Sequence, residues 1–203
     1  MTSIKVETLP VGELATNCYL VWAPETKEAV IIDPGDEANF ISEKILQLDL
    51  KPKVILATHG HFDHILAARE LQLAFRIPFG LHQADEPLIR LMTTSARWWL
   101  KREIVEQPPR VDLWLEAKQT IKLGRLKLKI IHLPGHTPGG VGFYSESERL
   151  FFSGDTIFYN AVGRTDLPYS SRVELEQSLR KIKQHFDQFM VYPGHGPQFK
   201  LVN

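Results

Sequence analysis

The chain has 203 residues, of which 43% are hydrophobic and 24% charged, and its 24 basic residues balance its 24 acidic ones. Such a composition is typical of a globular protein with a sizeable core, and a net charge of zero gives no basic field for binding nucleic acid or an anionic membrane. No apolar run approaches the roughly 20 residues of a membrane span, and the start lacks the apolar core of a signal peptide. The single cysteine, Cys18, excludes an internal disulfide. We therefore expect a cytoplasmic protein.

The first half of the chain alternates strands with helices. Short apolar runs bounded by turn residues predict buried strands, and apolar residues at helical spacing predict amphipathic surface helices. The expected strands cover residues 4–9, 17–23, 29–32 and 54–57, and the expected helices cover residues 37–50 and 65–73.

The second half begins with a short predicted strand, 77–81, that leads to His82, which we interpret as a polar surface group. Residues 83–115 mix helical character with large side chains such as Trp98 and Trp99; we expect these aromatic residues to pack, and the length of the segment makes it a candidate lid. The other expected elements are strands at 120–124, 126–130, 141–144, 150–152 and 189–192 and a helix at 173–187.

Four potential metal ligands follow the strand at 54–57 within six residues. They are His59, His61, Asp63 and His64. Side chains two apart in an extended loop point the same way, so His59 and His61 can bind one cation, while the pair that follows faces another way and favours a second ion. Imidazole and carboxylate together suit Zn, Fe, Mn or Co. The sequence therefore predicts a metal site on this loop, at the carboxyl end of a strand.

Three further candidate ligands each follow a strand and sit beside glycine: His136, Asp155 and His195. The two halves also share an order, strand–acid–helix–strand–histidine, which suggests two similar layers facing each other. Strands outnumber helices, and no glycine-rich dinucleotide or phosphate loop is present. We therefore expect an α/β fold, a four-layered αββα sandwich rather than a Rossmann sheet.

Several motifs resemble the metallo-β-lactamase fold superfamily, in the right order and over almost the whole chain. They are residues 58–64 (THGHFDH), 134–139 (PGHTPG), 153–156 (SGDT) and 193–196 (PGHG), with 17–21 and 31–35 similar to that family's opening. Asp155, in place of the cysteine of true class B lactamases, is similar to the glyoxalase II branch. Residues 163–168 resemble its short, single-domain members.

The resemblance implies roles for the candidate ligands. One metal ion would take His59, His61 and His136, the second would take Asp63, His64 and His195, and Asp155 would bridge them. The expected cofactors are two divalent ions per chain, Zn first, with Fe or Mn as alternatives. A bridging hydroxide would attack a carbonyl carbon.

Three acidic or basic residues have roles that the sequence leaves more open. Asp63 is the expected catalytic residue, because its second oxygen can orient the nucleophile. Asp33 either ties down the histidine-rich loop or simply forms a turn. Arg164 either binds a substrate anion or braces its loop through Asp166.

The leading functional hypothesis is hydrolysis of a small-molecule thioester such as S-lactoylglutathione. The chain ends eight residues after His195, so we expect one domain, residues 1–203, without the C-terminal helical domain with which glyoxalase II proper holds glutathione; glutathione as the carrier stays open. The alternative is a mononuclear iron persulfide dioxygenase using His59, His136 and Asp155. Phosphodiester and β-lactam hydrolysis also occur on this fold, and the sequence carries no signal for an oligomeric state.

Overall fold

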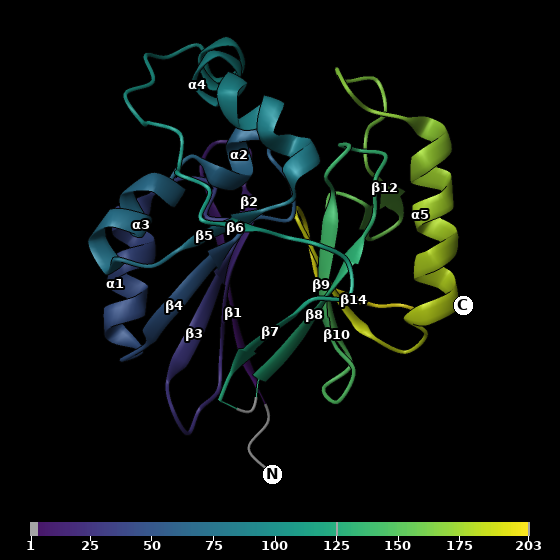
Figure 1. Ribbon diagram of the computed structural model, residues 1–203, viewed down its shortest axis with the longest axis horizontal. Coiled ribbons are helices and arrows are strands. Elements are labelled where there is room, and N and C mark those ends of the chain that lie inside the picture. Colours follow the sequence, from purple (N-terminus) through teal and green to yellow (C-terminus); the bar gives the residue numbers. More distant parts are fainter. Residues whose placement is uncertain (1–3, 125, 203) are drawn as a thin grey trace.

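Two six-stranded sheets pack face to face in the computed structural model, which describes residues 4–124 and 126–202, and helices cover both outer faces (Figure 1). Helices α1 (Ala38–Gln47) and α3 (Ala68–Phe75) lie on the first sheet, and α5 (Arg172–His185) lies on the second. This arrangement confirms the predicted αββα sandwich.

The first sheet has the order β1-β2-β3-β4-β5-β6, antiparallel from β1 to β3 and parallel from β3 to β6. Between β5 and β6 lie the short 3-10 helix η1 (Gln83–Asp85) and helix α4 (Glu86–Leu100), which sits above the edge of the sheet (Figure 1). The strands are β1 (Lys5–Val11), β2 (Thr16–Trp22), β3 (Glu28–Ile32), β4 (Lys51–Leu56), β5 (Phe79–Leu81) and β6 (Leu113–Trp114).

The second sheet has the order β14-β13-β10-β9-β8-β7, with one parallel pair, β10 and β13. A separate two-stranded hairpin, β11 (Ile157–Phe158) and β12 (Ala161–Val162), follows β10. The strands of the large sheet are β7 (Thr120–Leu123), β8 (Leu126–His132), β9 (Val141–Ser145), β10 (Leu150–Gly154), β13 (Met190–Pro193) and β14 (Phe199–Lys200).

Three apolar cores separate the four layers. Strand β3 illustrates the cause: Ile31 packs toward the helices while Val30 and Ile32 pack between the sheets, because successive side chains of a strand point to opposite faces. Phe151 of β10 likewise packs under α5, and its neighbour Phe152 lies between the sheets. Strands β3 and β10 are therefore buried on two faces, which explains their continuous apolar runs, whereas β8 near the edge of the second sheet alternates between buried and more exposed residues.

The element boundaries differ from expectation in a few places. The helix expected at 65–73 is two helices, because α2 (Phe62–Ile65) starts earlier and α3 is separate. Strand β4 begins at Lys51, earlier than the expected strand at 54–57, and includes Pro52 at a register shift against β3 that accommodates its missing N–H. Hairpin β11–β12 and strand β14 were not predicted, because two-residue strands leave no period to detect.

Parallel pairing explains where polar residues meet. Strands β3 and β4 are parallel neighbours in the first sheet, and β10 and β13 are parallel neighbours in the second. The residues after their carboxyl ends therefore meet at one edge of the sandwich. Among the described residues, no helix is long and apolar enough to cross a membrane.

Candidate metal centre

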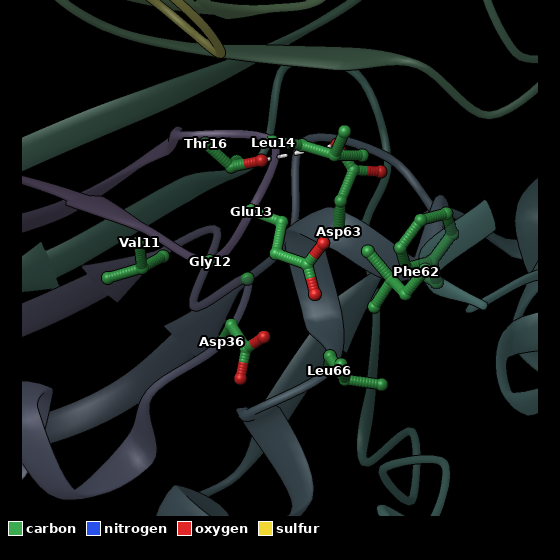
Figure 2. A pocket seen from close by; sticks show the side chains of 11 residues that line it. Val11, Gly12, Glu13, Leu14, Thr16, Asp36, Phe62, Asp63 and Leu66 are labelled. Carbon is green, nitrogen blue, oxygen red and sulfur yellow. Dashed lines mark hydrogen bonds between the residues drawn. The ribbon is translucent and has the colours of Figure 1, made fainter. Parts of the chain in front are cut away.

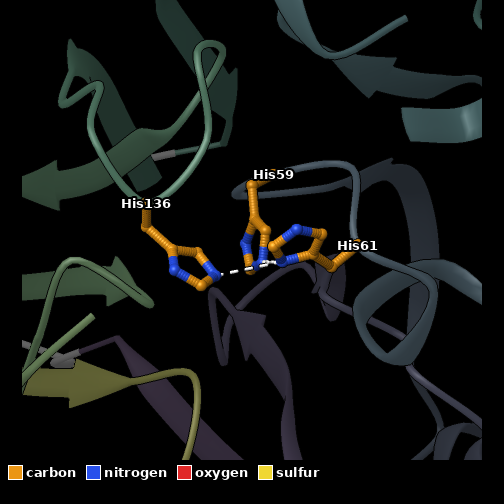
Figure 3. Close-up of side chains that lie close together, drawn as sticks. All are labelled: His59, His61 and His136. Carbon is orange, nitrogen blue, oxygen red and sulfur yellow. Dashed lines mark hydrogen bonds between the residues drawn. The ribbon is translucent and has the colours of Figure 1, made fainter. Parts of the chain in front are cut away.

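A first group of ligand atoms consists of three histidine nitrogens at the edge of the sandwich (Figure 3). Nδ1 of His61 lies 3.1 Å from Nε2 of His59 and 3.0 Å from Nε2 of His136. His59 and His61 come from the loop after β4, and His136 comes from the turn between β8 and β9. Nitrogens that ligate one zinc ion at about 2.0–2.1 Å come this close to one another.

A second group contains Asp63, His64 and His195. Oδ2 of Asp63 lies 3.6 Å from Nε2 of His64 and 3.3 Å from Nε2 of His195. Asp63 and His64 belong to the single turn of α2, and His195 follows β13 in the opposite sheet.

Asp155 lies between the two groups. Its carboxylate oxygens are 3.4 Å from Nε2 of His64, 3.6 Å from Nε2 of His136 and 3.6 Å from Nε2 of His195. A Cβ added to Gly194 would overlap Oδ1 of Asp155, so glycine is required for this approach. The structure thus brings all seven candidate ligands together. The two sets that the resemblance implies are both present, and His59, His64 and Asp155 form a third group that connects them.

Four of the histidines are oriented through their Nδ1 atoms. Nδ1 of His64 donates to Oδ2 of Asp33 (3.1 Å), that of His136 to the carbonyl of Arg164 (2.9 Å), and that of His195 to the carbonyl of Leu14 (3.1 Å). His59 Nδ1 meets Oγ1 of Thr58 at 3.1 Å. Because these contacts engage the Nδ1 atoms, the Nε2 atoms point into the cluster, where a metal ion can be bound.

The donor set fits a pair of metal ions. Among the described residues, the only buried side-chain atoms without a hydrogen-bond partner are His64 Nε2 and Asp155 Oδ1, and they face each other. An unpartnered buried polar atom is costly unless something binds it. A shared cation would satisfy both, and five imidazoles with two carboxylates suit Zn, Fe or Mn.

The electrostatic environment differs between the two groups. Burial and the neighbouring imidazoles hold the pKa of His59 well below its usual value and lower that of His61 to about 3. His64 is also buried, but the carboxylates of Asp155, Asp63 and Asp33 outweigh the burial and raise its pKa to about 10. The first group therefore presents neutral nitrogen ligands, whereas the carboxylates around the second group favour a positive charge there.

Asp33 holds the start of the histidine-rich loop. Its Oδ1 accepts from the backbone N–H of Thr58 and its Oδ2 from Oγ1 of Thr58, both at 2.6 Å, and it is buried. Its φ of 52° is left-handed, a conformation that aspartate tolerates better than most residues. Of the two roles considered from sequence, the contacts match the one in which Asp33 ties this loop and His64 together.

Asp85 was not singled out from the sequence, although it joins the two histidine loops. The fully buried carboxylate accepts from the N–H of Gly60 (2.9 Å), Oγ1 of Thr137 (2.8 Å) and the N–H of Gly139 (2.6 Å). Burial raises the pKa of Asp85 despite these three donors. It follows β5 as Asp33 follows β3, and only that placement after a strand could have drawn attention to it.

Asp63 has a hydrogen-bond donor of its own. Oγ1 of Thr16 donates to Oδ2 of Asp63 at 3.1 Å, beside a small depression that Figure 2 shows from close by. The depression has room for about one water molecule (about 10 Å³), so it is not a substrate site. Thr16 lies in β2 and was not among the predicted site residues.

The remaining candidates lie around a larger cavity, about 490 Å³, that opens over the ligands. Arg164 lines it, but its guanidinium binds Asp166 through two hydrogen bonds. Trp99 lines it too. The expectation that the aromatic residues of 83–115 pack is wrong for Trp98, Trp99 and Trp114, which are 62%, 43% and 41% exposed. His82 instead stacks on His132, with ring centroids 4.4 Å apart.

Comparison with known proteins agrees with this geometry. The chain is 37% identical over 196 residues to hydroxyacylglutathione hydrolase GloC of Haemophilus influenzae, with 95% of this chain and 91% of that protein covered. It is similar to the solved structure of the B3 metallo-β-lactamase BLEG-1, with a TM-score of 0.89, 32% identity, and 97% of this chain and 94% of that chain covered. A structure of TTHA1623 in a di-iron-bound form gives a TM-score of 0.86 and 37% identity, with 96% and 94% covered. A model of the metallo-beta-lactamase superfamily matches residues 11–195, and the protein belongs to that superfamily.

Proposed function

We propose that this protein is a dinuclear metal-dependent hydrolase of the glyoxalase II type, which cleaves a small thioester. The observation that carries the proposal is the pair of ligand groups with Asp155 between them, 3.4 Å from His64 and 3.6 Å from His136. Two relatives support it: GloC is named a hydroxyacylglutathione hydrolase, and TTHA1623 is described as di-iron-bound.

Individual side chains of the protein would have separate roles in the reaction. Two bound divalent ions would supply a water of lowered pKa and a Lewis acid for the carbonyl oxygen. Asp63 uses Oδ2 to accept from Thr16, which leaves Oδ1 to hold the proton of the attacking water and fix its direction. Hydrogen bonds from Nδ1 of His136 and His195 to backbone carbonyls keep both rings from turning away.

Zinc is our first expectation for the metal, with iron or manganese as alternatives. All seven donors are imidazole nitrogens or carboxylate oxygens, and none is a thiolate, so softness does not select among these ions.

The proposal is tested by thioester hydrolysis in wild-type protein and in His195→Ala. His195 belongs only to the second ligand group, and its side chain is partly exposed (29%), so the variant should fold. We expect S-lactoylglutathione or a related thioester to be cleaved by the wild type, and the variant to retain about one metal ion and lose at least about a hundredfold in kcat. Thr165→Ala, which removes a half-buried polar side chain outside the ligand groups, serves as the control.

Other reactions of this fold give different results in the same experiment. A persulfide dioxygenase needs only His59, His136 and Asp155, so His195→Ala would keep its single iron and its oxygen uptake with glutathione persulfide. Cleavage of a β-lactam instead of a thioester would move the assignment toward the activity named for BLEG-1. Wild-type protein that holds two metals and cleaves no thioester contradicts the proposal.

A further inference from the structure

Two kinds of side chain line the cavity over the ligands. Part of the lining consists of ligand side chains, including His61 and Asp155. Most of the rest comes from helix α4 and from the segment 158–169. We call this part the cavity wall; it consists of Leu88, Leu91, Ser95 and Trp99 from α4 and of Phe158, Arg164, Leu167, Pro168 and Tyr169 from the segment.

Helix α4 presents one face to the cavity. Its wall residues are spaced by three, four and four positions, which places them along one side of a helix. Met92 and Ala96 are completely buried in the core beneath, so the helix is fixed in position. Leu91 and Trp99 nevertheless remain 41% and 43% exposed. Large apolar side chains left open around a cavity are typical of a ligand site rather than of packing.

The wall carries little charge. Arg164 is the only lysine or arginine among the described residues that line the cavity. Its Nε and Nη2 donate to the carboxylate of Asp166 at 2.9 and 2.8 Å, and its guanidinium lies 5.7 Å from the centre of the Trp99 ring. Arg164 thus links the segment to α4, with its charge already balanced by Asp166.

Glutathione carries carboxylate groups and an ammonium group, and the wall has no unpaired charge to receive them. We propose that the substrate is a thioester with an apolar substituent, an aromatic ring or an alkyl chain, that lies against Leu91 and Trp99 while the carbonyl faces the ligand groups. This inference rests on the proposed thioesterase function and concerns specificity only. The apolar substituent belongs either to the acyl group or to the thiol.

Two substrate series distinguish whether the apolar substituent belongs to the acyl group or to the thiol. The first keeps glutathione as the thiol and varies the acyl group through lactoyl, acetyl, butanoyl, hexanoyl and phenylacetyl. The second keeps the lactoyl group and varies the thiol through glutathione, N-acetylcysteamine and 2-phenylethanethiol. We expect kcat/KM to rise in one of the two series: either about twofold to fourfold per added methylene along the acyl series, because burying one methylene is worth up to about 0.8 kcal/mol, or from glutathione to 2-phenylethanethiol along the thiol series.

Trp99→Ala should abolish that rise, lowering kcat/KM about tenfold for the most apolar substrate and by a clearly smaller factor for S-lactoylglutathione. The matched control is Trp114→Ala, since Trp114 is equally exposed (41% against 43%) but lies on β6 and does not line the cavity. The control should keep the wild-type slope. Equal melting temperatures would show that both variants are folded.

The outcomes separate this inference from the function on which it rests. If thioesters are cleaved but kcat/KM is flat or falls with apolar size in both series, the inference is wrong and the thioesterase function stands. The same holds if the rise survives in Trp99→Ala or disappears equally in Trp114→Ala. If no thioester of either series is cleaved, the proposed function fails first, and the inference falls with it.

Discussion

The seven ligand side chains come from loops and the short helix α2 that follow strands of both sheets, whereas the cavity wall comes from helix α4 and from the segment 158–169, which begins in the hairpin β11–β12. The ligands are held by buried carboxylates: Asp33 binds Thr58 and His64, and Asp85 binds the loops of His59 and His136. The wall has one comparable polar link, the Arg164–Asp166 pair, and it is exposed.

This difference indicates that the ligand groups and the cavity wall have separate roles. A buried polar network leaves few alternative arrangements, so the ligand groups are fixed before any substrate arrives. Partly exposed apolar side chains can be exchanged at small cost in stability, so the wall can change its preference while the chemistry below it stays the same. Changes to the ligand groups, to the buried carboxylates that hold their loops, and to the wall should therefore have large, intermediate and small effects, respectively, on metal binding and catalysis.

The largest effect should follow removal of the shared ligand. We expect Asp155→Ala to bind at least one metal ion fewer per chain and to lose about a thousandfold or more in kcat, since several kcal/mol of charge stabilisation depend on the ions. Elemental analysis and kinetics on the same preparation measure both. Glu43→Ala, which removes an exposed carboxylate from α1, should change neither. An Asp155→Ala protein with full metal content would contradict the bridging role.

An intermediate effect should follow a change in the support of the two histidine loops. Asp85→Asn keeps the shape of the side chain but turns one acceptor oxygen into a donor, so either the N–H of Gly139 or the pair Thr137 and Gly60 loses its acceptor. We expect metal affinity to fall about tenfold to a hundredfold, as for other groups that orient metal ligands. The visible spectrum of the cobalt-substituted protein should shift as well, because the ligand geometry changes.

The neighbouring Glu86→Gln is the control for Asp85→Asn, because Glu86 is exposed and pairs with Arg90 on the surface of α4. If both variants keep the wild-type affinity and cobalt spectrum, Asp85 does not position the ligands. A lower melting temperature alone would indicate a purely structural role.

The smallest effect should follow a change in the wall's polar link. Arg164→Ala removes an exposed guanidinium but keeps the backbone carbonyl that accepts from His136. Exposed ion pairs contribute little, so we expect kcat to change less than about fivefold. The change in KM should be the same for glutathione and N-acetylcysteamine thioesters. A KM that rises only for the glutathione thioester would show that Arg164 binds a substrate anion.

The sequence could predict the ligand groups because their signals are local. His59, His61, Asp63 and His64 lie within six residues, and the runs 29–32 and 150–152 are apolar because both faces of β3 and of β10 are buried. The αββα sandwich could be predicted from such runs. The order strand–acid–helix–strand–histidine, which both halves share, indicated that Asp155 and His195 lie near the histidine-rich loop. Metal binding by these residues and the single-domain organisation remain predictions.

The carboxylate of Asp85, which holds the two histidine loops, and the cavity wall could not be predicted in the same way. The partners of Asp85 are 25, 52 and 54 positions away in the chain, so nothing near Asp85 reveals them. Trp99 has the same local pattern as an aromatic residue that packs in a core. Only the tertiary placement of α4 over the ligands turns it toward the cavity.

The central claim is that the two ligand groups each hold a metal ion, and its most direct test is the metal content of protein purified without added metal. We predict about two ions of Zn, Fe or Mn per chain for the wild type and about one for His195→Ala, measured by elemental analysis against protein concentration. A single iron per chain in both proteins would contradict the account, because the second group would then bind nothing.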